Sequence, residues 1–260
     1  MFNIVFLGSI LTLVSLVTIK IFNIISYSNI KIVQINSADI NISTGKISEI
    51  IEKFKKYLDI EDLQIKYGET ESYCNVGNML NARKKIIEIP KWVMPSVGYE
   101  LDYLLGSIWY NACLYKKESF IKKYNLAAYK LQIMFMFIYL LVIVLNFCLF
   151  FTLEFILKEE DISSSYLYLI WSYHILDVID IFAFLFYISF QFLAAKSKLN
   201  LESMYERKLI KFVDEELAGY KSDLATARIF ALQITKLYFS LFKINSKTSN
   251  LKFLGPFTNL

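Results

Sequence analysis

The stretch "LQIMFMFIYLLVIVLNFCLFFTLEFIL", residues 131–157, decides the fold class of this chain. Its single charged side chain is Glu154, which lies close to its end. A helix of about 20 apolar residues is long enough to cross the hydrocarbon core of a bilayer. The stretch therefore predicts a membrane-spanning helix, and 56% hydrophobic residues overall agree with a membrane protein.

Three further apolar stretches lie on either side of this span. Residues 2–25 have no basic leader and no small-residue cleavage site, so we interpret them as a retained anchor. Residues 166–195 form another long span. Residues 227–244 carry Lys236 in their middle, so a fourth span and an amphipathic interfacial helix are equal interpretations. We expect an α-helical multi-pass membrane protein with three or four membrane helices and a small α+β cytoplasmic insert.

Lysine and arginine residues predict the orientation, because they are enriched in cytoplasmic flanks. They precede the span at 131–157 and follow the one at 166–195. We therefore expect a cell-membrane protein with its N-terminus and the loop 158–165 outside. The expected domains are an N-terminal anchor at 1–25, a cytoplasmic insert at 26–130, a membrane hairpin at 131–195, and a cytoplasmic amphipathic helix with the fourth apolar helix at 196–260.

The insert at 26–130 has the pattern of a helix, two or three strands and a second helix. The first helix has Ser43 or Thr44 as its N-cap and apolar residues at helical spacing, namely Ile47, Ile50, Ile51, Phe54 and Leu58. Strand-like runs follow at 63–68, 73–80 and 84–90, with a turn at 81–83. The second helix is expected from Pro95 to about Lys117, with one apolar face formed by Leu101, Leu104, Leu105, Ile108 and Ala112.

Several function classes are disfavoured by charge and motif content. The net charge is only +4, from 28 basic and 24 acidic residues, and no basic stripe indicates nucleic-acid binding. Neither glycine-rich nucleotide-binding motif is present. The three cysteines have no metal-ligand spacing and indicate reduced thiols. We expect the lipid bilayer and other membrane proteins as partners, and no nucleic acid or nucleotide.

The order of these segments resembles the YugP-like membrane zinc metallopeptidases, neutral zinc metallopeptidase family 2. The likeness rests on "STGKISEIIEKFKKYLDIEDLQIKYGE", "NARKKIIEIPKWV", "ISFQFLAAKSKLNLESM" and "DLATARIFALQITKLYF". The family's active helix carries H-E-x-x-H, in which two histidines bind zinc and the glutamate acts as base. The resemblance puts Trp109, Tyr110 and Cys113 at the His, Glu and His positions, and Ser189 at the third, glutamate ligand.

This chain has one histidine in total, so the zinc motif is absent in every register. The resemblance therefore implies a degenerate relative, a pseudoenzyme, with no catalytic residue, cofactor or metal. Trp109 then either fills the space of the lost metal or is an ordinary core residue of its helix.

The stretch "YHILDVIDIF", residues 173–182, places His174, Asp177 and Asp180 on one helix face inside the third span. The functional interpretations are a proton or cation site, or a polar contact to another helix. Asn146 in the second span is the expected hydrogen-bond partner. The alternative is the solvated outer end of a helix that is longer than the membrane is thick.

The expected function is a non-catalytic integral membrane protein that binds other membrane proteins or acts as a complex subunit. Two alternatives remain from the sequence. One is a membrane-bound peptidase or hydrolase with a rebuilt site, for instance at Cys113. The other is an ion- or proton-coupled membrane subunit that uses Asp177 and Asp180.

Overall fold

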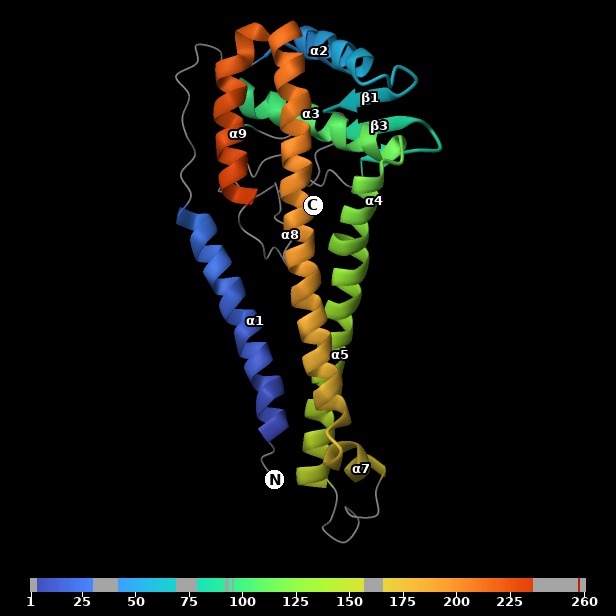
Figure 1. Ribbon diagram of the computed structural model, residues 1–260, viewed down its shortest axis with the longest axis vertical. Helices are drawn as coiled ribbons and strands as arrows, with labels where there is room; N and C mark the ends of the chain where they lie inside the picture. Colours follow the sequence, from blue (N-terminus) through green and yellow to red (C-terminus); the bar gives the residue numbers. More distant parts are fainter. Residues whose placement is uncertain are drawn as a thin grey trace. The chain divides into compact units, whose positions relative to one another are not determined.

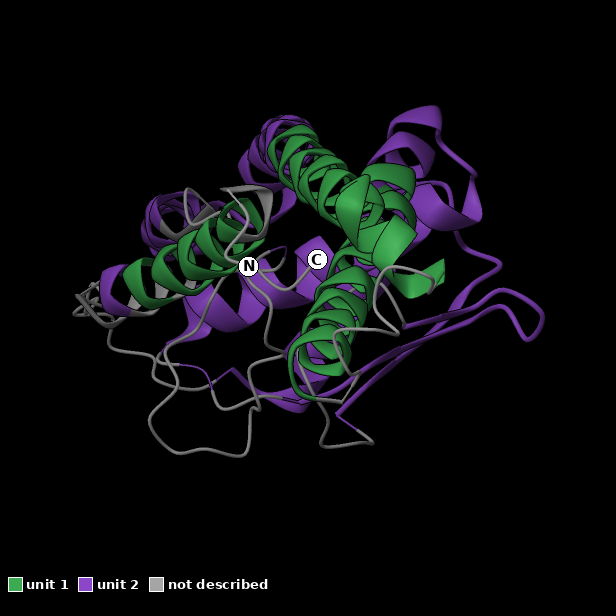
Figure 2. Cartoon of the chain, turned by 90° about the horizontal axis from the view of Figure 1, so that it is seen from below, with its two compact units in different colours: residues 1–22, 125–194 green, residues 23–124, 195–260 purple. Residues whose placement is uncertain are grey.

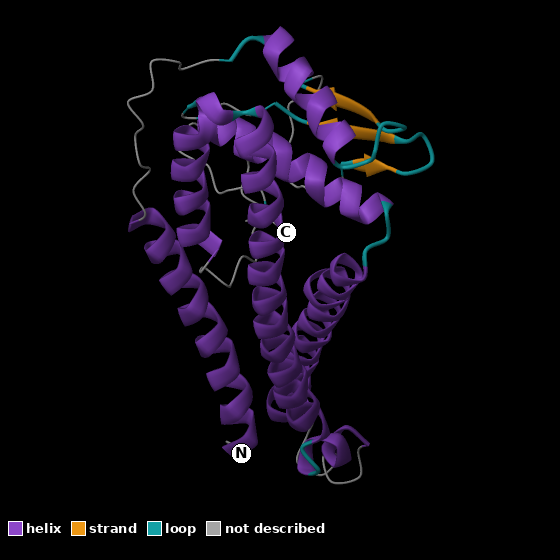
Figure 3. Ribbon diagram, turned by 45° about the horizontal axis from the view of Figure 1, so that its top comes forward, coloured by secondary structure: helices purple, strands orange, loops and turns teal. Residues whose placement is uncertain are grey.

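The computed structural model describes residues 4–29, 42–68, 79–91, 94, 96–156, 166–235 and 257. These residues are mostly helical, with one small sheet (Figure 3). The chain divides into two compact units, shown in Figure 2. Unit 1 comprises residues 1–22 and 125–194, and unit 2 comprises residues 23–124 and 195–260. The C-terminal segment thus shares a unit with the insert, whereas the sequence analysis assigned the two to separate domains.

Two of the described helices are long and apolar enough to cross a membrane, and each has residues in both units. The first is the continuous helical stretch Ser119–Phe155 (Figure 1). It begins with α4 (Ser119–Asn125) and the π-helical turn η2 (Leu126–Leu131). It continues through α5 (Gln132–Phe151) into a second π-helical turn, η3 (Thr152–Ile156). The second is α8, Ile175–Glu216. Their most apolar stretches are only 28% and 33% buried, unlike the core helix of a soluble protein. Helix α1 (Ile4–Asn29) contains a shorter apolar stretch, Leu7–Ile19.

A continuous helix was expected over residues 166–195, but the structure has two helices separated at His174, so that prediction is wrong there. Helix α7 (Tyr166–Ser172) ends before α8 begins at Ile175. His174 has a left-handed backbone with φ of 56°, which an α-helix cannot contain, and its N–H bonds to the Trp171 carbonyl. The break places Trp171 against Leu149 in an apolar cluster. His174 therefore precedes the helix that carries Asp177 and Asp180.

The first part of unit 2 confirms the expected local structure. Helix α2 (Thr44–Tyr57) begins after Ser43, whose side chain accepts a hydrogen bond from the Lys46 N–H. Three strands, β1 (Gln64–Tyr67), β2 (Leu80–Asn81) and β3 (Ile86–Ile89), form a sheet of order β1-β3-β2. β1 pairs with β3 in parallel and β2 pairs with β3 antiparallel. Residues 73–78 of the expected middle strand lie outside the described residues.

Helix α3 (Val97–Tyr115) forms the centre of unit 2. Its existence was expected, and the expected apolar face is buried, but burial extends around the helix, because every residue from Val97 to Ala112 except Glu100 is buried. Helix α9 (Lys221–Thr235), which follows the short turn η4 (Ala218–Tyr220), packs along α3. Gly98 permits this contact, since a Cβ there would lie 2.3 Å from the Asp223 carbonyl oxygen.

The expected fourth membrane helix at 227–244 begins inside α9. Ala227, Phe230 and Ala231 are buried in unit 2, where α9 contacts α3. Residues 227–235 therefore form part of a packed helix and not the start of an isolated membrane span. Residues 236–244 lie outside the described part of the chain.

Candidate functional site

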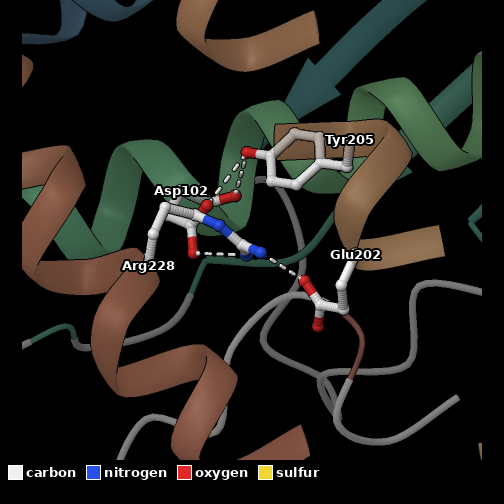
Figure 4. A network of polar contacts seen from close by, with 4 residues as sticks. All are labelled: Asp102, Glu202, Tyr205 and Arg228. Atoms are coloured by element: carbon white, nitrogen blue, oxygen red, sulfur yellow. Dashed lines mark hydrogen bonds and ion pairs between the residues drawn. The ribbon is translucent and has the colours of Figure 1, made fainter. Parts of the chain in front are cut away.

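A buried ion-pair network connects three helices in unit 2. Asp102 comes from α3, Glu202 and Tyr205 from α8, and Arg228 from α9 (Figure 4). The Arg228 guanidinium contacts both acids: Nη1 lies 3.4 Å from Asp102 Oδ2, and Nη2 lies 2.5 Å from Glu202 Oε2. The Tyr205 hydroxyl donates to the Asp102 carboxylate at 3.0 Å. All four residues are at most 4% exposed, so the network is sealed from water.

The charges of this network largely compensate one another. Burial raises the pKa of Asp102 to about 6, although the Arg228 charge acts in the opposite direction. Burial also raises the pKa of Tyr205, which keeps its hydroxyl protonated and able to donate. Lys198 is 8% exposed and interacts with Glu202, which brings a second positive charge near that acid. Both carboxylates of this network are thus bonded to Arg228, and removal of one partner would leave an uncompensated buried charge.

An aromatic cluster surrounds Trp109 on the same helix. The Trp109 ring packs against Tyr205, Phe120 and Phe257, with ring centroids 5.6–6.0 Å apart. Phe257 also contacts Tyr110 and Tyr205 and is completely buried. Trp109 is 3% exposed and Tyr110 is fully buried. The space beside these two positions is therefore filled by aromatic rings.

The other positions that the resemblance singled out do not complete a metal site. Cys113 lies on α3 one turn after Trp109, and burial raises the pKa of its thiol to about 12. Ser189 lies on the part of α8 that belongs to unit 1, whereas Trp109, Tyr110 and Cys113 belong to unit 2. Across the described ranges, no group of three or more His, Cys, Asp or Glu side chains is placed to hold a metal ion. A zinc site needs at least three such ligands.

The polar residues of the third span form a second cluster, in unit 1. Asp177 is 1% exposed and receives three contacts. Asn146 Nδ2 on α5 donates to its Oδ1 at 2.5 Å, and the Ser9 hydroxyl on α1 donates to the same atom at 3.3 Å. His174 Nδ1 lies 3.5 Å from its other oxygen. The expected Asn146 contact is confirmed, and three helices meet at this aspartate.

Asp180 lies one turn further along α8 and is completely buried. Ser9 and Thr12 of α1 are its polar neighbours, and Tyr139 of α5 is close to it. The Thr12 hydroxyl lies 3.2 Å from the Tyr139 hydroxyl. Burial of both aspartates contradicts the interpretation of a solvated helix end. Their carboxylates face neighbouring helices of the same unit.

Asp102, Glu202, Tyr205 and Arg228 were not identified from the sequence, although a signal was present. Asp102 lies in the apolar run "LDYLLG" and Arg228 in "ARIFAL". A lone charge within an apolar helical stretch indicates a buried partner, as it did for Asp177. Ser9 and Thr12 carried no comparable signal, because hydroxyl groups are common in apolar helices and bond to their own backbone.

The fold and these sites define a mostly helical protein with a small sheet and two helices long enough to cross a membrane. Comparison with known proteins adds nothing to this class. No protein-family model matches the chain, no curated protein matches it, and no solved structure matches it.

Proposed function

We propose that this chain is a non-catalytic integral membrane protein that binds another membrane protein, on a scaffold related to the neutral zinc metallopeptidases. The observation that carries the proposal is the packing around Trp109 and Tyr110. The resemblance places a zinc ligand and the general base at these positions, and their surroundings are filled by Phe257 and Tyr205. A catalytic zinc also needs an open coordination position for water.

The proposed topology is multi-pass, with the N-terminus outside and unit 2 in the cytoplasm. Large apolar side chains point outward along α5 and α8, as expected for contact with lipid or with a partner helix: Phe137, Leu141, Val144, Phe182, Leu185 and Phe192. Lysines cluster where these helices enter unit 2, and the positive-inside rule assigns such flanks to the cytoplasm.

The alternative of a hydrolase that uses Cys113 has less support. A cysteine nucleophile reacts as its thiolate, and reactive cysteines have lowered pKa values. The pKa of Cys113 is raised, chiefly by burial, and Glu118 raises it further. The buried carboxylates of Asp102 and Glu202 are bonded to Arg228 and so are not free to act as a base.

The first experiment is to measure metal content and peptide cleavage together in the full-length protein. The protein is purified in detergent without a histidine tag and without added zinc. The proposal expects far less than one zinc per chain and no cleavage of casein or unfolded membrane peptides. One zinc per chain together with cleavage that a chelator abolishes would overturn the non-catalytic assignment.

Partner binding is tested by photocrosslinking in native membranes. A photoreactive residue replaces Phe137 or Phe182 on the outward apolar faces, and a matched control replaces Glu49 on the exposed side of α2. The proposal expects one crosslinked protein of defined mass from at least one apolar position and none from the control. Lipid adducts alone at both apolar positions would contradict partner binding through these faces.

A further inference from the structure

The two buried aspartates of unit 1 differ in their hydrogen-bond donors. Asn146 and Ser9 donate to one Asp177 oxygen, and His174 Nδ1 lies 3.5 Å from the other. Neither oxygen of Asp180 receives a hydrogen bond from any described residue, although the side chain is completely buried. A buried carboxylate without donors or a counter-charge is strongly unfavourable in an apolar medium.

The hydroxyl groups beside Asp180 have their hydrogens directed elsewhere. Ser9 lies near both carboxylates, and its single hydrogen is donated to Asp177. Thr12 donates its hydrogen to the Ser9 carbonyl at 2.8 Å. Tyr139 must then be the donor in its contact with Thr12. The hydrogen bonds that Ser9 and Thr12 donate thus end on other groups, while both hydroxyl oxygens lie beside Asp180.

Asn146 adds an independent observation from α5. Its amide nitrogen is bonded to Asp177, while its amide oxygen receives no hydrogen bond within the described part of the chain. The Asn146 side chain is 1% exposed. A second buried acceptor without a donor thus lies in the same polar cluster.

We propose that Asp180, with the oxygen atoms of Ser9 and Thr12, binds a small monovalent cation, either Na⁺ or a proton. Carboxylate, hydroxyl and amide oxygens are hard ligands that suit such a cation. Acidic residues inside membrane segments face the helix bundle and mark ion pathways or proton relays. The cation supplies the positive charge that the surrounding acceptors require. This inference is independent of the proposed partner binding.

Titratable groups of α8 and α5 lie around Asp180, and α1 contributes neutral polar groups. Asp177 lies on the same helix as Asp180, and His174 directly precedes that helix. On α5 the titratable neighbour of Asp180 is Tyr139. On α1 the polar neighbours are the neutral Ser9 and Thr12. Asp177 adds negative charge and strengthens the attraction for a cation, while His174 Nδ1 lies 3.5 Å from Asp177 Oδ2.

The test uses the full-length protein in detergent, with infrared detection of a protonated carboxyl group and a dye that reports released protons. NaCl is added to protein in weakly buffered solution, with N-methylglucamine chloride at equal ionic strength as the reference. The wild type is compared with Asp180→Asn. Glu154→Gln is the matched control, because Glu154 is an exposed acid in the same unit. Size-exclusion profiles and far-UV circular dichroism establish that each variant is folded.

A Na⁺ site releases up to one proton per chain on NaCl addition, and the carboxyl band disappears with it. A proton site shows the carboxyl band near neutral pH without any response to Na⁺. Asp180→Asn removes the signal in either case, and Glu154→Gln retains it. The proposal is overturned if the wild type shows neither signal, or if Asp180→Asn keeps it. If Asp180→Asn does not fold, Thr12→Val serves as the second variant, and unchanged Na⁺ affinity and unchanged carboxyl titration in it would overturn the proposal.

Discussion

The Tyr205 hydroxyl on α8 donates to the Asp102 carboxylate on α3 at 3.0 Å, and both side chains are completely buried. The same hydroxyl also lies 3.1 Å from the Asp102 carbonyl oxygen. The Tyr205 ring packs on Trp109 and beneath the Arg228 guanidinium, which lies 5.0 Å from the ring centroid. Tyr205 therefore joins the ion-pair network of unit 2 to its aromatic cluster.

Tyr205→Phe removes this hydrogen bond and keeps the ring. A hydrogen bond to a charged group contributes about 1.5–3 kcal/mol, so we expect the free energy of unfolding to fall by about that amount. Thermal unfolding in detergent, followed by near-UV circular dichroism, measures the change. Tyr57→Phe is the matched control, because the Tyr57 hydroxyl bonds to the Lys208 carbonyl at an exposed position. Equal shifts for the two variants would contradict the assignment.

The pKa of Asp102 predicts a pH dependence of stability. Its pKa is about 6 in the folded protein and about 3.8 ordinarily, so the folded state binds this proton more tightly. The resulting stabilisation is fully present below about pH 3.8 and is lost as the pH rises to about 6. The unfolding temperature of the wild type relative to Asp102→Asn should therefore fall across this interval and stay constant up to pH 8. A relative rise across the same interval would be the opposite of this expectation.

Gly98→Ala should disrupt the contact between α3 and α9. The added Cβ would lie 2.3 Å from the backbone oxygen of Asp223, which cannot move without shifting α9. Overpacking of this kind costs about 1–3 kcal/mol. Gly219→Ala is the control, because a Cβ at Gly219 meets no atom within 4 Å. The unfolding midpoints of the two variants give the comparison, and a Gly98 variant as stable as the Gly219 variant would contradict the close packing.

Phe257→Ala should open the aromatic cluster around Trp109. Removing a buried phenylalanine ring costs about 3–5 kcal/mol, and water gains access to the neighbouring rings. In a Trp92→Phe, Trp171→Phe background, acrylamide should quench the fluorescence of Trp109 more strongly in the Phe257→Ala variant. Phe120→Ala removes another ring from Trp109, but one at a partly exposed position, and should have a smaller effect. Unchanged quenching in the Phe257 variant would refute the contact.

Cys113 should react slowly with alkylating reagents. Its pKa is raised to about 12, chiefly by burial, so very little thiolate is present at pH 8. In a Cys74→Ser, Cys148→Ser background, we expect iodoacetamide to modify the folded protein at least tenfold more slowly than the denatured protein. Mass spectrometry over time measures both rates. A folded protein that reacts as fast as the denatured one would reopen the possibility of a cysteine nucleophile.

Local features of the fold were predictable from sequence because they depend on neighbouring residues. The spacing of Ile47, Ile50 and Phe54 predicts α2, and Ser43 caps it as expected. The strands around Tyr67 and Ile87 and the turn between β2 and β3 likewise follow from local preference. The length and apolar character of 131–157 determine a helix that is able to cross a bilayer.

The tertiary structure alone decided the rest, because it depends on contacts between distant residues. Arg228 contacts Asp102, which lies 126 residues away in the sequence, and no local pattern encodes that pairing. Helix α3 is buried beyond its apolar face because α9, the sheet and Tyr205 of α8 pack against it, whereas its sequence suggested one apolar face. The sequence identified Asp177, Asp180 and Asn146 as polar residues in apolar helices. Only the approach of α1 showed that the Ser9 hydroxyl donates to Asp177, which leaves Asp180 without a donor among the described residues.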